Sequence, residues 1–317
     1  MIAVPELSIV ATMYRSTPFV KEFYRRITET AARVTPSFEL VLVDDGSPDD
    51  SLPVALALAD MDPRVRVVEL SRNFGHHTAM LAGLRHTRGE LVYLTDIDLE
   101  EQPEWLLDFW KDLHDSNSDM IYGVQTERAG SFIKRYTGSL FYRLFNLAAK
   151  PGIPTNGCTV RLMTRRYVDA VTAFKEFHIF MMGLFSWAGF RQKPRYVTKI
   201  RRSGQSNYTP LRLIALSVDA ITSFSSYPLT VVFVGGVVIT VISLLYALYL
   251  FVTKLLHPDL ILSGFTSIMV SLWLIGGSVI SVLGLIGIYL GKIFTESKER
   301  PQYLVRKVYE RLPGESP

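Results

Sequence analysis

The sequence predicts an α/β domain with a mostly parallel sheet, followed by a two-helix transmembrane hairpin. Residues 1–125 alternate short apolar runs of β character with longer stretches of helical character, which is the pattern of successive βαβ units. Residues 229–252 and 265–291 are apolar and carry no charged residue. Each is longer than the roughly 20 helical residues that a bilayer core requires. These observations define the predicted fold class.

Five strands are expected in the first part of the chain. Their near-continuous apolar character is typical of a sheet that helices cover on both faces. The strands are expected at 7–12, 38–43, 65–70, 90–95 and 119–124, and helices between them at 17–35, 50–60, 76–87 and 103–115. In such sheets ligands bind beyond the carboxyl ends of the strands, where Asp44-Asp45 and Asp96-Ile97-Asp98 fall.

The two apolar runs are expected to cross a membrane. A buried hairpin of a soluble protein is the alternative, but apolar runs of this length are rare in soluble cores. The connecting residues 253–264 have few basic side chains, whereas the tail after Gly291 is basic. The positive-inside rule therefore places the tail in the cytoplasm, and two spans place the N-terminal domain there too.

Amphipathic segments are expected at the membrane surface. Residues 209–227 and 130–150 both place apolar side chains at helical spacing, and the second is also basic, which suits an interfacial helix. The alternative for each segment is a helix packed on its own domain. The predicted organisation is a cytoplasmic domain at 1–208, an interfacial helix at 209–227, two transmembrane helices within 228–291 and a basic cytoplasmic tail at 292–317.

Composition excludes some other classes of protein. The net charge of +4 does not point to nucleic acid. A single cysteine, Cys158, allows neither a disulfide within the chain nor a Cys-rich zinc site. The N-terminus lacks the basic region of a signal peptide and is interpreted as a first strand.

Acidic residues are concentrated after the fourth predicted strand. Asp96, Asp98, Glu100 and Glu101 lie close together, and unpaired carboxylates repel one another. A helix start near Pro103 explains some of this charge, but a hard cation explains Asp96 and Asp98 better. Mg²⁺ and Mn²⁺ prefer carboxylate and phosphate oxygens and neutralise the charge on a diphosphate leaving group. The cluster therefore indicates nucleotide-sugar chemistry.

Several motifs together resemble one family. They are VDDGSPDD (43–50), LSRNFGHHTAMLAGLRHTRGE (70–90), DIDLEEQPE (96–104), RRSGQSNYTPLRL (201–213) and SFSSYPL (223–229), followed by the apolar hairpin. In order and spacing the chain resembles family 2 glycosyltransferases with a Rossmann-like GT-A fold. Within them it resembles the membrane-attached polyprenyl-phosphate glycosyltransferases, which include dolichyl-phosphate mannose synthase and bacterial undecaprenyl-phosphate sugar transferases.

The resemblance implies a role for particular residues. Asp96 and Asp98 would be the catalytic D-x-D pair and would bind the metal with Glu100, Asp98 being favoured as the ligand. Arginine binds phosphate through its bidentate fork. The implied nucleotide-binding residues are Thr12, Tyr14, Asp44, Asp45, Arg72 and Asn73, and the implied acceptor-phosphate residues are Arg128, Arg135 and Arg201.

The chain departs from the family pattern at three positions. Arg15-Ser16 replaces the usual Asn-Glu, Thr159-Val160-Arg161-Leu162 replaces Asp-Phe-Arg-Leu, and Met182-Gly183 replaces Arg-Gly. These departures concern the donor sugar and part of the phosphate site rather than the fold. His76-His77 is not expected to be a metal pair, because adjacent residues on a helix do not face the same way.

The function implied is transfer of one sugar, with inversion, from a UDP-sugar to undecaprenyl phosphate, for cell-envelope glycan modification. The enzyme would be a multi-pass inner-membrane protein that uses Mg²⁺ or Mn²⁺ and forms a homo-oligomer such as a tetramer. A lipid monophosphate, with a second pKa of about 6, needs no general base. Two alternatives stay open: a sugar-hydroxyl acceptor with Glu100 or Glu101 as base, and a non-enzymatic membrane scaffold.

Overall fold

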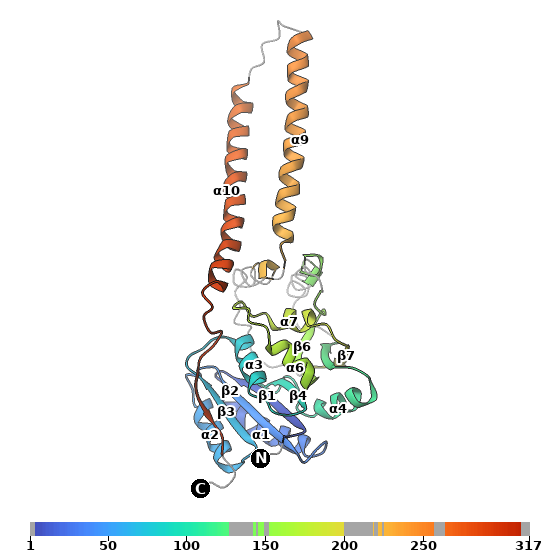
Figure 1. Ribbon diagram of the computed structural model, residues 1–317, viewed down its shortest axis with the longest axis vertical. Coiled ribbons are helices and arrows are strands. Elements are labelled where there is room, and N and C mark those ends of the chain that lie inside the picture. The colour runs from blue at the N-terminus through green and yellow to red at the C-terminus, as the bar shows by residue number, and fades with distance from the viewer. Residues whose placement is uncertain are drawn as a thin grey trace. The chain divides into compact units, whose positions relative to one another are not determined.

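The computed structural model of the chain forms two compact units (Figure 1). It describes residues 4–126, 142–143, 145–148, 152–199, 218, 221–223, 225–256 and 264–311. The first unit comprises Met1–Asn146, Pro151–Thr209 and Arg300–Pro317, and the second comprises Leu147–Lys150 and Pro210–Glu299. The predicted segment 209–227 lies mostly, and 130–150 largely, outside the described residues.

The first unit is built on an eight-stranded sheet with the order β7-β5-β6-β4-β1-β2-β3-β8. The strands β1 to β4 are parallel where they pair, whereas β6 runs antiparallel to β4 and β5, and β8 antiparallel to β3. The mostly parallel α/β class is confirmed. The strands are β1 Leu7–Met13, β2 Phe38–Asp44, β3 Val65–Leu70, β4 Leu91–Asp96, β5 Met120–Gln125, β6 Gly157–Thr164, β7 Gln192–Val197 and β8 Val305–Tyr309.

Helices cover both faces of this sheet, as its apolar strands require. The helices are α1 Thr17–Ala31, α2 Ser51–Met61, α3 His76–Arg85, α4 Trp105–Asp115, α6 Arg165–Thr172 and α7 Met181–Trp187. Buried residues of α1, α2 and α4 form one core cluster with alternate residues of β1 and β2. On the opposite face α3 approaches so closely that a Cβ on Gly83 would lie 2.4 Å from Val10 Cγ1.

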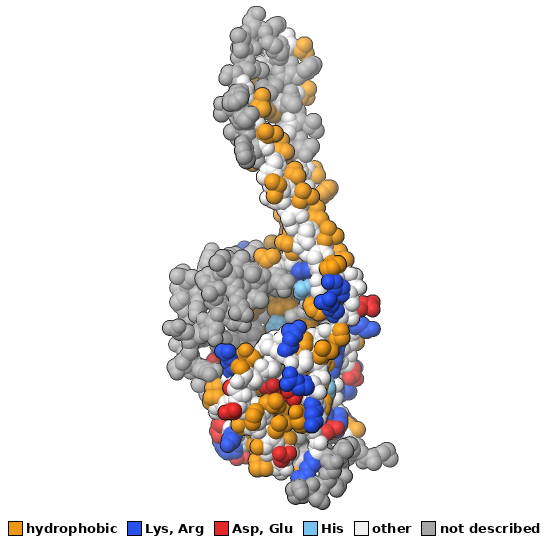
Figure 2. Space-filling model, turned by 90° about the vertical axis from the view of Figure 1, so that its left-hand side faces the viewer, with side chains coloured by type: hydrophobic (Ala, Val, Ile, Leu, Met, Phe, Trp, Pro, Cys, Tyr) orange, Lys and Arg blue, Asp and Glu red, His pale blue; other side chains and the backbone are white. Residues whose placement is uncertain are grey.

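The second unit contains two long helices, α9 Tyr227–Leu256 and α10 Phe265–Glu296. Its described helical surface is largely hydrophobic (Figure 2). Within the described residues, one segment, Leu274–Glu296, is long and apolar enough to cross a membrane by length and composition, and the apolar stretch Tyr227–Ser243 is shorter. Both helices therefore form where the apolar runs predict them, and one of them meets the criterion for a span.

Candidate active site

The site begins where three parallel strands end. Met13 of β1 pairs with Asp44 of β2, and Thr12 pairs with Asp96 of β4. The shared register brings these carboxyl ends to one edge of the sheet, as expected for this fold class. Predicted residues from distant parts of the sequence are thereby brought together.

The D-x-D stretch forms a turn at the end of β4. Ile97 is buried in the core, whereas Asp96 and Asp98 are partly exposed. Asp98 Oδ1 accepts the backbone N–H of Glu100 at 3.0 Å. Between them Leu99 has a φ of 64°, a left-handed conformation that non-glycine residues adopt rarely and that is often found at functional sites.

His76 is the first basic partner of this turn. Its Nε2 lies 3.3 Å from Asp96 Oδ1, and its Nδ1 lies 3.1 Å from Thr12 Oγ1. Burial lowers the pKa of His76, but the neighbouring Asp96 carboxylate outweighs this effect and raises it. Burial likewise raises the pKa of Asp96, and the His76 contact reverses the shift so that the net pKa is lowered.

Lys199 is the second positive partner. Its Nζ lies 2.9 Å from Oε1 of Glu101, whose side chain is fully buried. Glu101 also accepts the backbone N–H groups of Thr159 at 3.0 Å and Asp96 at 3.4 Å. Burial raises the pKa of Glu101 to about 7 despite the lysine. The buried Glu101 carboxylate therefore holds the turn in place. Because it is buried and already bonded to these groups, Glu101 is disfavoured as a general base for a sugar hydroxyl.

The predicted nucleotide pocket lies beside β2. Asp44 accepts the backbone N–H of Ser47 at 3.2 Å. Asp45 accepts those of Phe74 at 2.7 Å and Gly75 at 2.9 Å. Both aspartates are 2% exposed, and burial raises the pKa of each. The structure thus shows Asp45 fixing the loop that precedes α3.

That loop presents the other predicted nucleotide residues. Arg72 and Asn73 are exposed, and the Arg72 guanidinium lies 4.0 Å from the centre of the Phe74 ring. Tyr14 is 45% exposed, while Thr12 is buried at 8%. The exposed residues Tyr14, Arg72 and Asn73 can contact a ligand directly. Thr12 is buried and can affect the site through its contact with His76.

The carboxylates of the turn suit a hard cation. Asp96 Oδ1 is buried and, apart from His76, has no partner among the residues that the structure describes. With Asp98 it offers the oxygen donors that Mg²⁺ and Mn²⁺ prefer. Across the described ranges, no group of three or more His, Cys, Asp or Glu side chains could hold a metal ion. A cation here would therefore take further oxygens from a diphosphate and water.

The sequence analysis names Arg161 and His77 but does not predict their burial beside the site. Arg161 is 2% exposed, lies 3.7 Å from the Phe185 ring centre and donates to the carbonyl oxygen of Cys158. Burial lowers its pKa to about 10. Burial also lowers the pKa of His77 to about 4, so this histidine is neutral at pH 7. The predicted acceptor-phosphate residues Arg128, Arg135 and Arg201 lie outside the described residues.

Comparison with known proteins identifies the family. A model of the family described as glycosyl transferase family 2 matches residues 8–172. Putative glycosyltransferases of Mycobacterium tuberculosis are 43% identical over 96% of this chain and 88% of the relative. The SfII prophage-derived bactoprenol glucosyl transferase of Shigella flexneri is 31% identical over 97% of this chain and 100% of the relative. The chain belongs to glycosyl transferase family 2.

Solved structures are also similar to this chain. Mannosyltransferase PcManGT from Pyrobaculum calidifontis, in complex with GDP-Man and Mn²⁺, matches 70% of this chain and 64% of its own, with 18% identity and a TM-score of 0.46. The S. aureus TarS fragment 1–349 in complex with UDP-GlcNAc matches 69% of this chain and 66% of its own, with 17% identity and a TM-score of 0.44.

Proposed function

We propose that the chain transfers a single sugar, with inversion, from a UDP-sugar to undecaprenyl phosphate. Relatives named bactoprenol glucosyl transferase match 95–97% of the chain at 31–32% identity, which supports a prenyl-phosphate acceptor. The observation that carries the proposal is the D-x-D turn, which begins at the same edge of the sheet as Asp44 and Asp45. The lipid-linked product would serve cell-envelope glycan modification.

The proposed mechanism assigns a task to each part of the site. Asp44, Asp45 and the Arg72–Asn73 loop would bind the nucleotide, and Asp96 and Asp98 would hold Mg²⁺ or Mn²⁺, whereas Glu100 does not complete a three-carboxylate site with them in the described residues. When bound, the cation would neutralise charge on the diphosphate leaving group. An oxygen of the lipid phosphate attacks the anomeric carbon, the bond from that carbon to the diphosphate oxygen breaks, and the nucleoside diphosphate leaves with the bonding electrons. The acceptor is already an anion, so no proton has to be removed.

The proposed setting is the inner membrane. Helices α9 and α10 would form a two-span hairpin, 209–227 would lie at the interface, and the catalytic domain and C-terminus would face the cytoplasm. The apolar surface of both helices supports this arrangement. The acceptor phosphate would be bound by Arg128, Arg135 and Arg201. A homo-oligomer stays a prediction from the family resemblance.

Nucleoside-diphosphate release tests this function. The purified protein in detergent is given undecaprenyl phosphate, Mg²⁺ or Mn²⁺, and a panel of UDP-, GDP- and dTDP-sugars. We expect release to require lipid and metal and to prefer one UDP-sugar. Asp98→Asn should lower kcat about 10²-fold or more, as loss of an electrostatic contact to the transition state does. Asp60→Asn, at an exposed position near the end of α2, should leave kcat unchanged. Lipid-independent release, or full activity of Asp98→Asn, would contradict the proposal.

A further inference from the structure

The C-terminal strand β8 completes the sheet beside the predicted nucleotide site. It pairs with β3, placing Val67 opposite Tyr309 and Leu70 opposite Val305, with an irregularity between Glu69 and Leu70. The pairing continues past the end of β3, where the backbone N–H of Ser71 donates to the carbonyl of Leu304 at 2.9 Å. The tail therefore reaches the residue immediately before Arg72.

Side chains of β8 bind both carboxylate oxygens of Glu69, a buried residue near the end of β3. Glu69 is 5% exposed. Its Oε1 lies 2.8 Å from Nη1 of Arg306, and its Oε2 accepts the Tyr309 hydroxyl at 2.9 Å. Arg306 Nη2 also donates to the carbonyl of Ser71 at 2.9 Å. Arg306 thus links Glu69, near the end of β3, to Ser71, the first residue of the loop that follows the strand.

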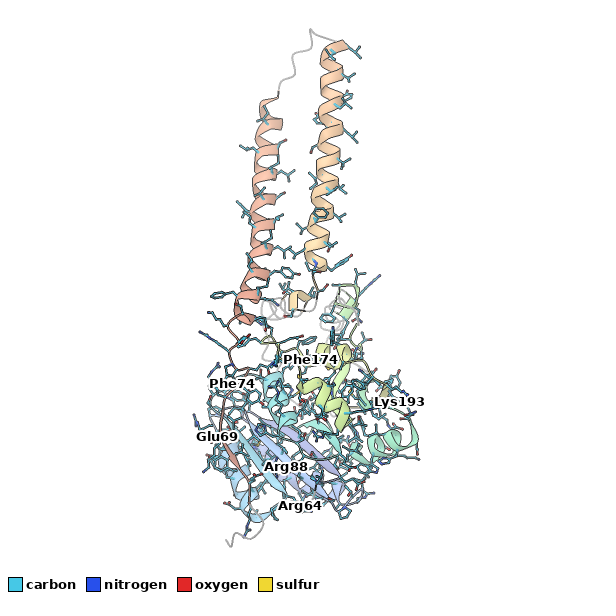
Figure 3. All side chains as sticks on the ribbon, in the orientation of Figure 1. Arg64, Glu69, Phe74, Arg88, Phe174 and Lys193 are labelled. Atoms are coloured by element: carbon cyan, nitrogen blue, oxygen red, sulfur yellow. The ribbon has the colours of Figure 1, made fainter. Side chains whose placement is uncertain are left out.

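The loop is held from its other side by β2. A Cβ on Gly46, whose φ is +65°, would lie 2.6 Å from the backbone of Arg72 and Asn73, so the two backbones are in direct contact. The Asp45 carboxylate accepts hydrogen bonds from the backbone N–H groups of Phe74 and Gly75. In Figure 3, Glu69 and Phe74 lie on the same side of the first unit. Arg72 and Asn73 are therefore positioned between the Asp45–Gly46 turn and β8.

The same C-terminal segment also contacts α3, the helix that begins with His76. Gln302 Oε1 accepts from Arg85 Nη1, in the last turn of α3, at 2.7 Å, and Gln302 Nε2 donates to the carbonyl of Glu176. The segment from Gln302 to Tyr309 thus supports the loop at 71–75 and the helix that follows it.

We propose that the β8 segment is a positioning element of the donor site, in which Arg306 and Tyr309, acting through Glu69, set the position of Arg72 and Asn73. These residues do not touch the nucleotide themselves. The inference rests on the proposed function, because the role of Arg72 and Asn73 belongs to it. It assigns to the basic tail a specific part in nucleotide binding.

Nucleotide affinity measured without acceptor tests the proposal. Dissociation constants for UDP, GDP and dTDP with Mn²⁺ are determined by calorimetry on the full-length protein. The double variant Arg306→Met/Tyr309→Phe leaves Glu69 buried without its donors, and we expect about tenfold weaker binding of the preferred nucleotide. Lys111→Met is the control: it removes a charge from an exposed position of α4, outside the β8 contacts, and should change affinity less than about twofold.

Further readouts separate positioning from general damage. In turnover assays the double variant should raise the KM for the nucleotide-sugar while leaving the KM for the lipid unchanged. Arg306→Lys, which keeps the charge facing Glu69, should recover part of the affinity. Tyr309→Phe alone, a milder change, should weaken binding in the same direction. Wild-type affinity in the double variant would overturn this inference alone, whereas a wild-type protein that binds none of the nucleotides would overturn the proposed function with it.

Discussion

At the scale of single residues, two different basic side chains lie against the acidic turn. His76 lies beside Asp96, and Lys199 beside Glu101. Removing one partner of a buried ion pair costs about 3–5 kcal/mol, because the remaining charge stays buried. Glu101 has no exposed surface, so it depends on Lys199. The ion pair links Glu101, just after the D-x-D turn, to Lys199, which lies two positions before Arg201 in the sequence.

Lys199→Met should therefore disturb the turn that carries Asp96. Without its cation, Glu101 will take up a proton at neutral pH or draw in water, since its pKa is already raised to about 7. We expect kcat/KM to fall at least about tenfold, equivalent to about 1.4 kcal/mol. Steady-state kinetics of nucleoside-diphosphate release measures the change.

A double-mutant cycle identifies the cause. Glu101→Gln/Lys199→Met replaces the ion pair with neutral side chains of similar size, so its melting temperature should lie above that of Lys199→Met alone. Additive effects of the two single changes would show that the pair is not coupled.

The sequence predicts one half of this site and not the other. Asp96, Asp98 and Glu101 lie in one short stretch, so their number and spacing are visible directly. Lys199 and His76 reach them only through the fold, from positions that are distant in the sequence and belong to no local charge pattern. The sequence analysis does not expect His76 and His77 to form a metal pair, but it does not predict the partners of His76, which are Asp96 and Thr12.

At the scale of elements, one carboxylate joins the beginnings of two helices. Asp49 accepts hydrogen bonds from the Thr17 backbone N–H at 3.2 Å and hydroxyl at 2.6 Å, at the start of α1. It also accepts those of Ser51, at 3.3 Å and 2.7 Å, at the start of α2. Burial raises the pKa of Asp49, but these donors outweigh it and lower the pKa to about 2.

The stability that Asp49 provides should depend on pH. Because the pKa of Asp49 in the folded protein lies below 3.8, the ordinary value for an aspartate, its contribution is complete above about pH 4 and is lost as the pH falls through about 2. Asp49→Asn should lower the free energy of unfolding by about 1 kcal/mol at pH 7, as loss of a helix cap does. Urea unfolding of the wild-type protein and of Asp49→Asn, in detergent between pH 7 and 2.5, measures how the difference in the free energy of unfolding depends on pH. A difference that stays constant down to pH 2.5 would contradict it.

Two of the three strands that the sequence analysis did not predict share a physical reason, namely their place at an edge of the sheet, whereas the third, β6, lies between β5 and β4. The five predicted strands are apolar and central, and each agrees with the structure to within a residue at either end. By contrast, β7 at one edge carries Lys193, Pro194 and Arg195, and β8 at the other carries Arg306 and Lys307. Edge strands face water and need no continuous apolar run, so local pattern gives them little signal.

At the scale of the whole molecule, the number of membrane crossings can be tested by labelling. Cys158, the sole cysteine, is replaced by serine, and single cysteines are introduced by Asp60→Cys, Asp259→Cys and Lys298→Cys. With two spans, a membrane-impermeant maleimide added to intact cells should label position 259 and leave 60 and 298 unlabelled until the cells are permeabilised. If α10 alone crossed the membrane, positions 60 and 259 would behave alike.

The place of β8 in the sheet also bears on how the protein is made. The first unit is discontinuous in sequence, since α9 and α10 are inserted between its β7 and β8 strands. During synthesis, β3 is an open sheet edge until β8 has left the ribosome, and an open edge invites pairing with other chains. The two apolar helices emerge before β8 does, so the sheet is closed only after both helices have been synthesised.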